Sequence, residues 1–310
     1  MDFACRDVVS IRDFGKEEIL YILDHAGKAM PVARGERRSD VLEGKILATL
    51  FFEPSTRTRL SFETAMLRLG GSVIGFADAS GTSVAKGETL ADTIRMAESY
   101  ADAIVLRHPM EGAAKLAADF STKPVINAGD GAGQHPTQTL LDLFTIKMEK
   151  GEIADNNIVL VGDLKYGRTV HSLTYALSLF GANITCVAPP TLQMPSEIMS
   201  HLKQMGGRFN QSESLESVIP GADVLYVTRI QKERFPDPEE YRKVENAYRI
   251  DNALLANAKR NLVVMHPLPR VNEIAPEVDL GPYARYFRQA FYGVPIRMAI
   301  LSLILGKGEI

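Results

Sequence analysis

Residues 53–59 read Glu-Pro-Ser-Thr-Arg-Thr-Arg and gather hydroxyl and guanidinium groups within a few positions. The proline precedes an apolar-periodic stretch, which is typical of a helix N-terminus, where free backbone N–H groups and the helix dipole favour an anion. The hydroxyls of Ser55, Thr56 and Thr58 add donors. The Arg57 guanidinium adds a planar fork that suits phosphate. A serine alone would indicate only a helix cap, but this combination predicts a phosphate site.

Further polar segments follow other apolar runs and are rich in basic, amide or hydroxyl side chains. They are residues 107–109, 135–138, 163–168, 229–234 and 267–270. In an open parallel sheet, ligands bind beyond the carboxyl ends of the strands. We therefore expect these side chains to converge at one edge of a sheet.

The elements that must position these segments alternate along the chain. Apolar runs suited to strands buried on both faces occur at residues 46–52, 72–77, 103–107, 125–127, 158–162, 184–188, 224–228 and 262–266. Helical patterns occur at residues 16–30, 55–69, 88–100, 136–149, 168–180, 196–205 and 285–305. This order predicts the α/β class, with two similar domains, each a parallel sheet flanked by helices. We expect the C-terminal helix to pack back on the first domain.

Length and composition limit the classes of protein to be considered. The chain has 310 residues, of which 45% are hydrophobic and 24% charged. These values are ordinary for a globular protein of about two domains. The formal net charge is −3, so the overall balance indicates neither a nucleic acid nor a membrane partner. An anion-binding site must therefore be formed by a local group of basic and hydroxyl residues.

Targeting and redox features indicate a cytoplasmic protein. Cys5 and Cys186 lie far apart, which argues against a disulfide scaffold and against a thiolate zinc site. The first residues carry acids where a secretion signal would carry basic and then apolar residues. Residues 294–305 are apolar, but they contain Arg297 and are too short to span a bilayer. They indicate a buried terminal helix.

Residues 51–59, Phe-Phe-Glu-Pro-Ser-Thr-Arg-Thr-Arg, resemble the carbamoyl-phosphate signature of the aspartate and ornithine carbamoyltransferase family. The segments at residues 107–109, 135–138 and 266–270 occur in the order typical of that family. The resemblance extends from residue 8 to residue 305.

Two segments of the second half resemble the aspartate enzymes of the family rather than the ornithine enzymes. Residues 228–234 contain Arg-x-Gln-x-Glu-Arg, and residues 266–270 read His-Pro-Leu-Pro-Arg. Ornithine enzymes typically lack the first pattern and have His-Cys-Leu-Pro at the second. The chemistry agrees, because aspartate brings two carboxylates and Arg168 and Arg229 can each clamp one.

The resemblance implies transfer of the carbamoyl group from carbamoyl phosphate to the amine of L-aspartate, giving N-carbamoyl-L-aspartate and phosphate in de novo pyrimidine biosynthesis. The sequence has no Gly-x-Ser-x-Gly motif and no cysteine within a motif, so we expect direct attack through a tetrahedral oxyanion. Stabilising that oxyanion is then the main demand. The alternatives are a carbamoyltransferase for another amine acceptor, such as ornithine, and a non-catalytic homologue.

The resemblance also assigns site residues by position. The implied carbamoyl-phosphate site comprises Ser55, Thr56, Arg57, Thr58, Ser83, Lys86, Arg107, His135, Gln138, Leu268 and Pro269. The implied catalytic residues are Arg57, Thr58, Lys86, Arg107 and His135. The implied aspartate site comprises Lys86, Arg168, Arg229 and Gln231.

Each implied role has a chemical reason. Arg107, a neutral His135 and the Thr58 hydroxyl would donate to the carbamoyl oxygen, although His135 as a base is an alternative. Gln138 and the backbone carbonyls of residues 267–268 would accept from the carbamoyl NH2. The departing phosphate is our hypothesis for the proton acceptor. The two substrates together carry about four negative charges near neutral pH, which explains the number of cations.

Residues 81–88 form a small, Gly-, Ser- and Thr-rich segment before a helix, which predicts a mobile surface loop. In the family this loop reaches the site of a neighbouring subunit, so Ser83 and Lys86 would complete shared active sites in a homotrimer. Some relatives carry a second adjacent lysine here, whereas Lys86 has none. The resemblance also allows a separate regulatory chain to join the trimer in a larger hetero-oligomer.

The resemblance divides the chain into two domains and a connecting helix. The expected limits are residues 1–134 with 288–310 for carbamoyl phosphate, residues 150–287 for aspartate, and an interdomain helix at residues 135–149.

We expect neither a cofactor nor a metal. The glycines around residues 162–168 lack the Gly-x-Gly-x-x-Gly spacing of a dinucleotide loop, and the histidines in helical patterns lack partners at metal-ligand spacing. Glu53 and Arg234 are candidates either for ion pairs that hold the two domains closed or for ordinary surface pairs.

Overall fold

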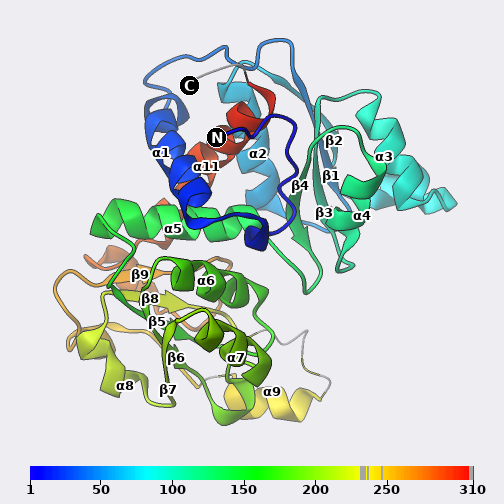
Figure 1. Ribbon diagram of the computed structural model, residues 1–310. Coiled ribbons are helices and arrows are strands. Elements are labelled where there is room, and N and C mark those ends of the chain that lie inside the picture. Colours follow the sequence, from blue (N-terminus) through cyan, green and yellow to red (C-terminus); the bar gives the residue numbers. More distant parts are fainter. Residues whose placement is uncertain (231–234, 236, 246, 307–309) are drawn as a thin grey trace. The chain divides into compact units, whose positions relative to one another are not determined.

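Parallel strands rich in aliphatic side chains form the centre of two units in the computed structural model, which describes residues 1–230, 235, 237–245, 247–306 and 310. The first unit is Met1–Phe144 with Phe291–Ile310, and the second is Thr145–Ala290 (Figure 1). Helices α5 (Pro136–Lys150) and α11 (Tyr286–Leu305) contribute residues to both units.

The first unit contains a four-stranded parallel sheet in the order β2-β1-β3-β4. Its strands are β1 (Ile46–Phe51), β2 (Ser72–Phe76), β3 (Ala103–His108) and β4 (Val125–Asp130). The central strands β1 and β3 are buried over most of their length, which explains their unbroken apolar sequence. Phe51 pairs with Arg107, and His108 pairs with Asp130. The carboxyl ends of β1, β3 and β4 therefore lie at one edge, as predicted.

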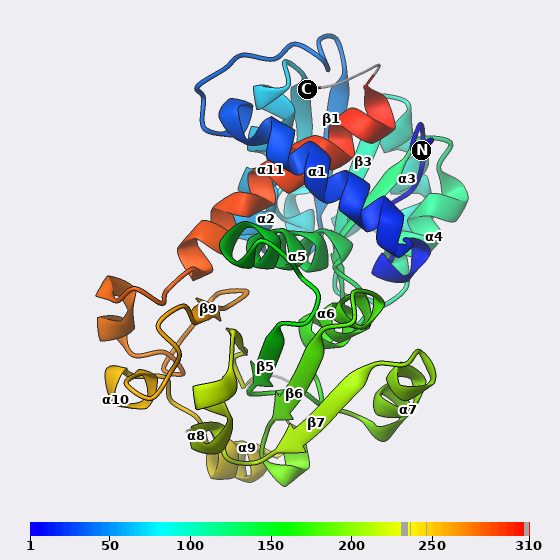
Figure 2. The ribbon, with the colours of Figure 1, turned by 60° about the vertical axis from the view of Figure 1, so that its left-hand side comes forward.

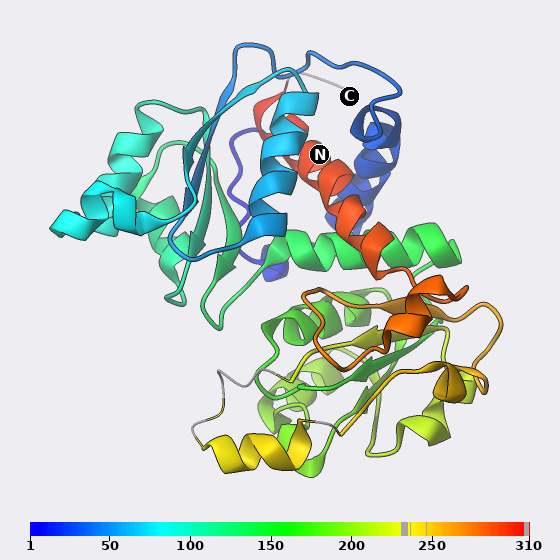
Figure 3. The same cartoon turned by 180° about the vertical axis from the view of Figure 1, so that it is seen from behind.

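Helices cover both faces of this sheet. They are α1 (Lys16–Ala33), α2 (Thr56–Arg68), α3 (Leu90–Glu98) and α4 (Ala113–Phe120), with parts of α5 and α11 and with the short 3₁₀ helices η1 (Ile11–Asp13), η2 (Ala79–Gly81) and η3 (Ser83–Lys86). Figures 1 and 3 show α3 and α4 on one face and α1, α2 and α11 on the other. Small and aliphatic side chains such as Ala48, Ile94 and Ala114 fill the core beneath α3 and α4.

The C-terminal helix α11 packs on the first unit, which confirms the prediction from the sequence. The Cys5 N–H donates to the Ile304 carbonyl at 3.1 Å. The rings of Tyr292 and Phe144 meet edge to face, with centroids 5.2 Å apart. No helix among the described residues has the length and apolar character required to cross a membrane.

The second unit contains a five-stranded parallel sheet in the order β7-β6-β5-β8-β9. Its strands are β5 (Asn157–Val161), β6 (Asn183–Val187), β7 (Arg208–Ser212), β8 (Val224–Val227) and β9 (Val263–Met265). Its helices are α6 (Arg168–Leu179), α7 (Ser196–Gln204), α8 (Leu215–Val218), α9 (Pro238–Val244), α10 (Asn252–Leu255) and the 3₁₀ helices η4 (Pro190–Leu192), η5 (Ile219–Gly221) and η7 (Pro276–Leu280). Figure 2 shows α6 and α7 on one face of the sheet and α8 and α10 on the other.

Strand β7 was not predicted from the sequence. It is an edge strand without a fully buried residue, and its sequence is Arg-Phe-Asn-Gln-Ser. An edge strand of this kind needs no continuous apolar run, because one side of its backbone faces no other strand. The second sheet therefore has one strand more than the apolar runs indicated.

Gly75 of β2 provides a test of the packing of the first sheet. Its φ is +145°, and a Cβ there would lie 2.1 Å from the carbonyl oxygen of Thr49 on β1. We expect Gly75→Ala to lower the free energy of unfolding by about 2–4 kcal/mol. Gly44→Ala is the control, because φ is +76° and nothing lies within 4 Å of the added carbon. It should cost about 1 kcal/mol in urea unfolding, and equal losses would contradict the packing argument.

Candidate active site

Helix α2 begins at Thr56, directly after β1, and Ser55 is its N-cap residue. Ser55 has extended backbone angles, φ −155° and ψ 90°, and its side chain makes no capping hydrogen bond within the described residues. Its hydroxyl is thus not used to cap the helix. Because the first-turn N–H groups of a helix have no intrahelical acceptors, this end of α2 presents donors and positive potential.

Two guanidinium groups are held close together at the same edge of the sheet. Burial, and then the nearby charge of Arg107, lower the pKa of the Arg57 guanidinium. Arg107, at the end of β3, donates to the Glu53 carboxylate and, at 3.1 Å, to the Ala128 carbonyl. Among the described residues, Glu53 is the only acid that pairs with either arginine. The cluster therefore keeps a positive charge and favours an anion.

Arg59 lies two residues farther along α2 and has a different environment. Its Nη1 is 3.2 Å from Glu63 Oε1 on the same helix, and Glu63 also accepts from the Thr49 hydroxyl at 3.4 Å. This arginine is neutralised by its neighbour. In contrast, Arg57 forms no ion pair within the part of the chain that the structure describes.

Buried polar side chains at the end of β4 shape the turn that leads to His135. The Asn127 amide donates to Asp130 Oδ1 at 3.0 Å, and the same oxygen accepts from the Gln134 N–H at 2.8 Å. The other oxygen of Asp130 accepts from the Gly112 N–H at 2.9 Å. These bonds fix the turn before α5 and hold His135 in a buried position one residue before that helix.

Gln138 lies on the first turn of α5, where a buried carboxylate orients its amide. Its Nε2 donates to Asp142 Oδ1 at 2.9 Å, one helical turn along. The amide oxygen is thereby directed away from Asp142. The role implied for Gln138, an acceptor through this oxygen, stays a prediction.

Ser83 and Lys86 form the ends of η3, and both side chains are exposed. Gly87 ends this short helix with φ +95°. Within the described residues, neither side chain forms a hydrogen bond or ion pair with the α2 and β3 residues of its own chain. The structure thus does not bring these two residues together with the rest of the phosphate site.

In the second unit, a glycine allows the segments that follow β5 and β8 to approach each other closely. Gly162 has φ +120°, and a Cβ there would lie 2.3 Å from the carbonyl oxygen of Thr228. The approach therefore requires glycine. Arg168 and Arg229 follow these two strand ends in the chain.

Local structure sets the position of Arg168 at the start of α6. Asp163 is fully buried, and its Oδ1 accepts from the Tyr166 N–H at 2.9 Å, which shapes the preceding turn. Arg168 is the first residue of α6, so its charge adds to the positive end of the helix dipole. Arg229 is half-buried after β8. Gln231 and Arg234 lie outside the described residues.

The segment after β9 contains Leu268 and Pro269. Leu268 has φ +54°, a left-handed conformation that costs about 1–2 kcal/mol for a residue other than glycine. Its N–H donates to His266 Nδ1 at 2.8 Å. Arg270 donates to the Asp279 carboxylate and, at 3.0 Å, to the Tyr286 hydroxyl. The segment is thus anchored on both sides of Leu268.

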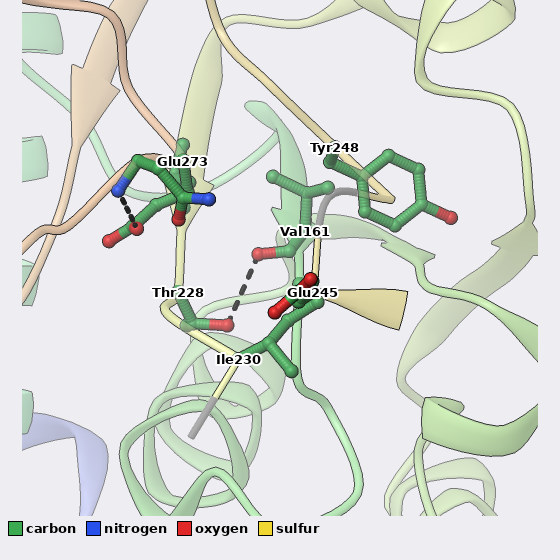
Figure 4. Close-up of a pocket in the computed structure, with 9 residues that line it drawn as sticks. Val161, Thr228, Ile230, Glu245, Tyr248 and Glu273 are labelled. Atoms are coloured by element: carbon green, nitrogen blue, oxygen red, sulfur yellow. Dashed lines mark hydrogen bonds between the residues drawn. The ribbon is translucent and has the colours of Figure 1, made fainter. Parts of the chain in front are cut away.

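A small pocket lies at the ends of β5 and β8 in the second unit (Figure 4). It is lined by Val161, Gly162, Val227, Thr228, Ile230, Glu245, Tyr248, Asn272 and Glu273. Across its base, the Thr228 hydroxyl donates to the Val161 carbonyl at 3.2 Å. Its volume of about 10 Å³ is room for about one water molecule, so this pocket does not hold an amino acid.

Two family models match almost the whole chain. The first is described as the carbamoyl-P binding domain of aspartate/ornithine carbamoyltransferase and matches residues 6–148. The second is described as the Asp/Orn binding domain and matches residues 154–304. The chain belongs to the aspartate/ornithine carbamoyltransferase family.

Individual carbamoyltransferases are similar over the full length. The chain is 61% identical over 307 residues to the aspartate carbamoyltransferase catalytic subunit of Methanocella arvoryzae, covering 99% of both chains. It superposes on the catalytic subunit of M. jannaschii aspartate transcarbamoylase with a TM-score of 0.90 and 57% identity, covering 96% and 97% of the two chains. The Trypanosoma cruzi enzyme in complex with carbamoyl phosphate and aspartate gives a TM-score of 0.93 at 41% identity, with 98% of both chains covered.

For a carbamoyltransferase, the structure gathers the implied phosphate residues only in part. The charge of Arg107 acts on Arg57 at the start of α2, whereas among the described residues Ser83 and Lys86 form no hydrogen bond or ion pair with these two arginines. Sequence reasoning missed the polar residues that orient the site, notably Asp130 and Asp142. In the sequence, each of these aspartates stands outside any recognised motif. Only its burial in the structure reveals the role.

Inorganic phosphate tests the anion site of this carbamoyltransferase. We expect phosphate to raise the melting temperature of the wild type, and Arg57→Ala to weaken the apparent affinity by about tenfold or more, because a charge-assisted hydrogen bond is lost. Arg59→Ala removes the same charge from the same helix and should change the affinity by less than about threefold, as that arginine is already paired. Equal weakening in both variants would show a general charge effect instead of a site.

Proposed function

We propose that this protein is an enzyme that transfers the carbamoyl group of carbamoyl phosphate to the amine of L-aspartate, forming N-carbamoyl-L-aspartate and phosphate. The observation that carries the proposal is the pair of guanidinium groups, Arg57 and Arg107, held at the positive end of α2. The relatives described above, which bear the name of the aspartate enzyme, support the choice of acceptor. They favour it over ornithine and over a non-catalytic homologue. De novo pyrimidine biosynthesis is the corresponding pathway.

Carbamoyl phosphate is bound mainly by residues of the first unit. The phosphate accepts from the first turn of α2, from the hydroxyls of Ser55 and Thr56, and from Arg57. The carbamoyl oxygen accepts from Thr58, Arg107 and His135. Gln138 and the backbone carbonyls of residues 267–268, with Pro269 beside them, receive the carbamoyl NH2 group. The orientation of Gln138 by Asp142 supports its part in this scheme.

L-Aspartate is bound mainly by residues of the second unit. Arg168 and Arg229 each bind one carboxylate, and Gln231 assists. Placement of Arg168 at the N-terminus of α6 supports this role, because the helix dipole adds to the guanidinium charge.

The reaction proceeds by direct attack of the uncharged α-amine on the carbamoyl carbon. A tetrahedral oxyanion forms, the C–O bond to phosphate breaks, and the departing phosphate takes the proton from the amine. Arg107 supplies most of the stabilisation of the oxyanion. Its contacts with Glu53 and the Ala128 carbonyl hold the guanidinium in place before the substrate arrives, so that little reorganisation is needed. His135 donates as the neutral imidazole.

The active form is a homotrimer in which Ser83 and Lys86 complete the site of a neighbouring subunit. Their exposure and their lack of contact with the phosphate cluster of the same chain support this arrangement. The same unit exposes apolar side chains on α2 and on the edge strand β2, where Leu60 is 50%, Leu67 60% and Ile74 41% exposed. Such neighbouring apolar side chains are typical of an interface. A regulatory chain would join this trimer as a further partner. The two cysteines are both free thiols, which agrees with a cytoplasmic enzyme.

A substrate assay tests the proposed reaction. We expect phosphate release from carbamoyl phosphate in the presence of L-aspartate, with little release above background in the presence of L-ornithine. Formation of N-carbamoyl-L-aspartate is confirmed by chromatography of the product. Turnover with ornithine alone would contradict the roles of Arg168 and Arg229. Binding of carbamoyl phosphate without turnover would identify a non-catalytic homologue.

Mixed trimers test the shared site. We expect Lys86→Ala and Arg57→Ala to be nearly inactive when each is prepared alone. After dissociation and reassembly of an equal mixture, about a quarter of the sites should regain both wild-type residues, because a symmetric trimer pairs each chain with a neighbour at random. Phosphate release before and after mixing measures the effect. A mixture that stays inactive would place both residues in the site of one chain.

A further inference from the structure

Both ring nitrogens of His266 are engaged, although no substrate role has been assigned to this residue. His266 follows β9 and is buried. Its Nδ1 accepts from the Leu268 N–H at 2.8 Å. The hydrogen of the neutral ring must therefore be on Nε2, which lies 2.7 Å from Glu273 Oε1 and donates to it.

Glu273 fixes this tautomer because its carboxylate acts only as an acceptor. Its second oxygen accepts from the N–H groups of Val271 and Asn272 at 3.0 and 3.1 Å. Burial raises the pKa of Glu273, but the hydrogen bonds from His266 and the backbone outweigh it, so that the pKa is lowered and the group stays ionised. Burial lowers the pKa of His266, and the charges of Arg270 and Arg229 lower it further against the opposing effect of Glu273. The pair is thus a neutral imidazole that donates a hydrogen bond to an ionised carboxylate.

The hydrogen bond from Leu268 to His266 determines where a backbone carbonyl points. The Pro267–Leu268 peptide is trans, so its C=O and N–H point in opposite directions. With the N–H directed at the imidazole, the Pro267 carbonyl is directed away from it. Leu268 itself has φ +54°, one of three positive φ values for residues other than glycine in the described chain. Strained residues that the surroundings hold in place are concentrated at functional sites.

We propose that His266 is a positioning residue for carbamoyl transfer, which orients the Pro267 carbonyl toward the carbamoyl NH2 group, and that Glu273 sets the tautomer required. This inference rests on the proposed function and deepens it. His266 itself does not touch the substrate. It acts through the Leu268 N–H in the way that an asparagine side chain holds the backbone two residues on in an Asx turn.

Two substitutions of His266 separate positioning from a general structural role. In His266→Asn, the side-chain oxygen can still accept from the Leu268 N–H, whereas the contact with Glu273 is lost. In His266→Leu, both contacts are lost. We expect His266→Leu to raise KM for carbamoyl phosphate about tenfold and to lower kcat about tenfold to a hundredfold, since the acceptors are no longer held. His266→Asn should stay within about threefold of the wild type in both constants.

The measurements are kcat, the KM of each substrate and the melting temperature for all proteins. Both variants should lose thermal stability, because both lose the Glu273 contact, and KM for aspartate should change by less than about threefold. Equal kinetic losses in the two variants, following their stability, would show a structural role only and overturn the inference. Wild-type kinetics in His266→Leu would overturn it as well.

Glu273→Gln provides a second test if His266→Leu does not fold. A carboxamide has one acceptor oxygen, so it cannot accept from both the imidazole and the two backbone N–H groups. We expect Glu273→Gln to raise KM for carbamoyl phosphate as His266→Leu does. Unchanged kinetics would overturn the inference. Absence of turnover in the wild type would overturn the proposed function and this inference together, whereas an active wild type with unaltered variants would overturn only the role of the His266–Glu273 pair.

Discussion

The guanidinium groups of Arg57 and Arg107 repel each other, and the structure of the first unit is arranged to keep them together in spite of this. Like charges that are partly removed from water interact more strongly than exposed ones, because the solvent screens them less. Glu53 at the end of β1 and the Ala128 carbonyl at the end of β4 hold Arg107 between them. Three adjacent strand ends are thus needed to fix one cation. In the proposed function, an anionic substrate would relieve the repulsion that remains.

Parallel strands meet this requirement because all their carboxyl ends lie at one edge of the sheet. In the first unit, the ends of β1, β3 and β4 supply an acid, an arginine and the turn that leads to His135. The second unit repeats the principle, with Arg168 and Arg229 after β5 and β8. There the close approach of the two segments depends on Gly162, which has no Cβ to collide with Thr228. Each unit therefore places charge by strand order rather than by local sequence alone.

The difference between strand order and local sequence explains which features could be predicted from the sequence. The buried strands could be predicted because each is an apolar run in the sequence. The hydroxyl and guanidinium groups of residues 53–59 indicated an anion site because they lie within one short segment. The exposed strand β7 gave no such signal. Likewise, Glu53 was a candidate for a domain-closing ion pair or an ordinary surface pair without a named partner, and the structure shows that it contacts Arg107, 54 residues away in the sequence. Contacts of this kind depend on register between strands, which the composition of a segment does not contain.

The choice of acceptor follows from the same electrostatics. Burial lowers the pKa of His266, and the charges of Arg270 and Arg229 also lower it, so both arginines act on the end of β9. The positive end of α6 beneath Arg168 adds to the positive charge of this unit. An acceptor with two carboxylates gains energy there, whereas the side-chain ammonium of ornithine would be repelled. Burial and the same charges disfavour protonation of His266, so that its Nδ1 can accept from the backbone. Substrate preference and the shape of the segment at Leu268 are thereby linked through one set of charges.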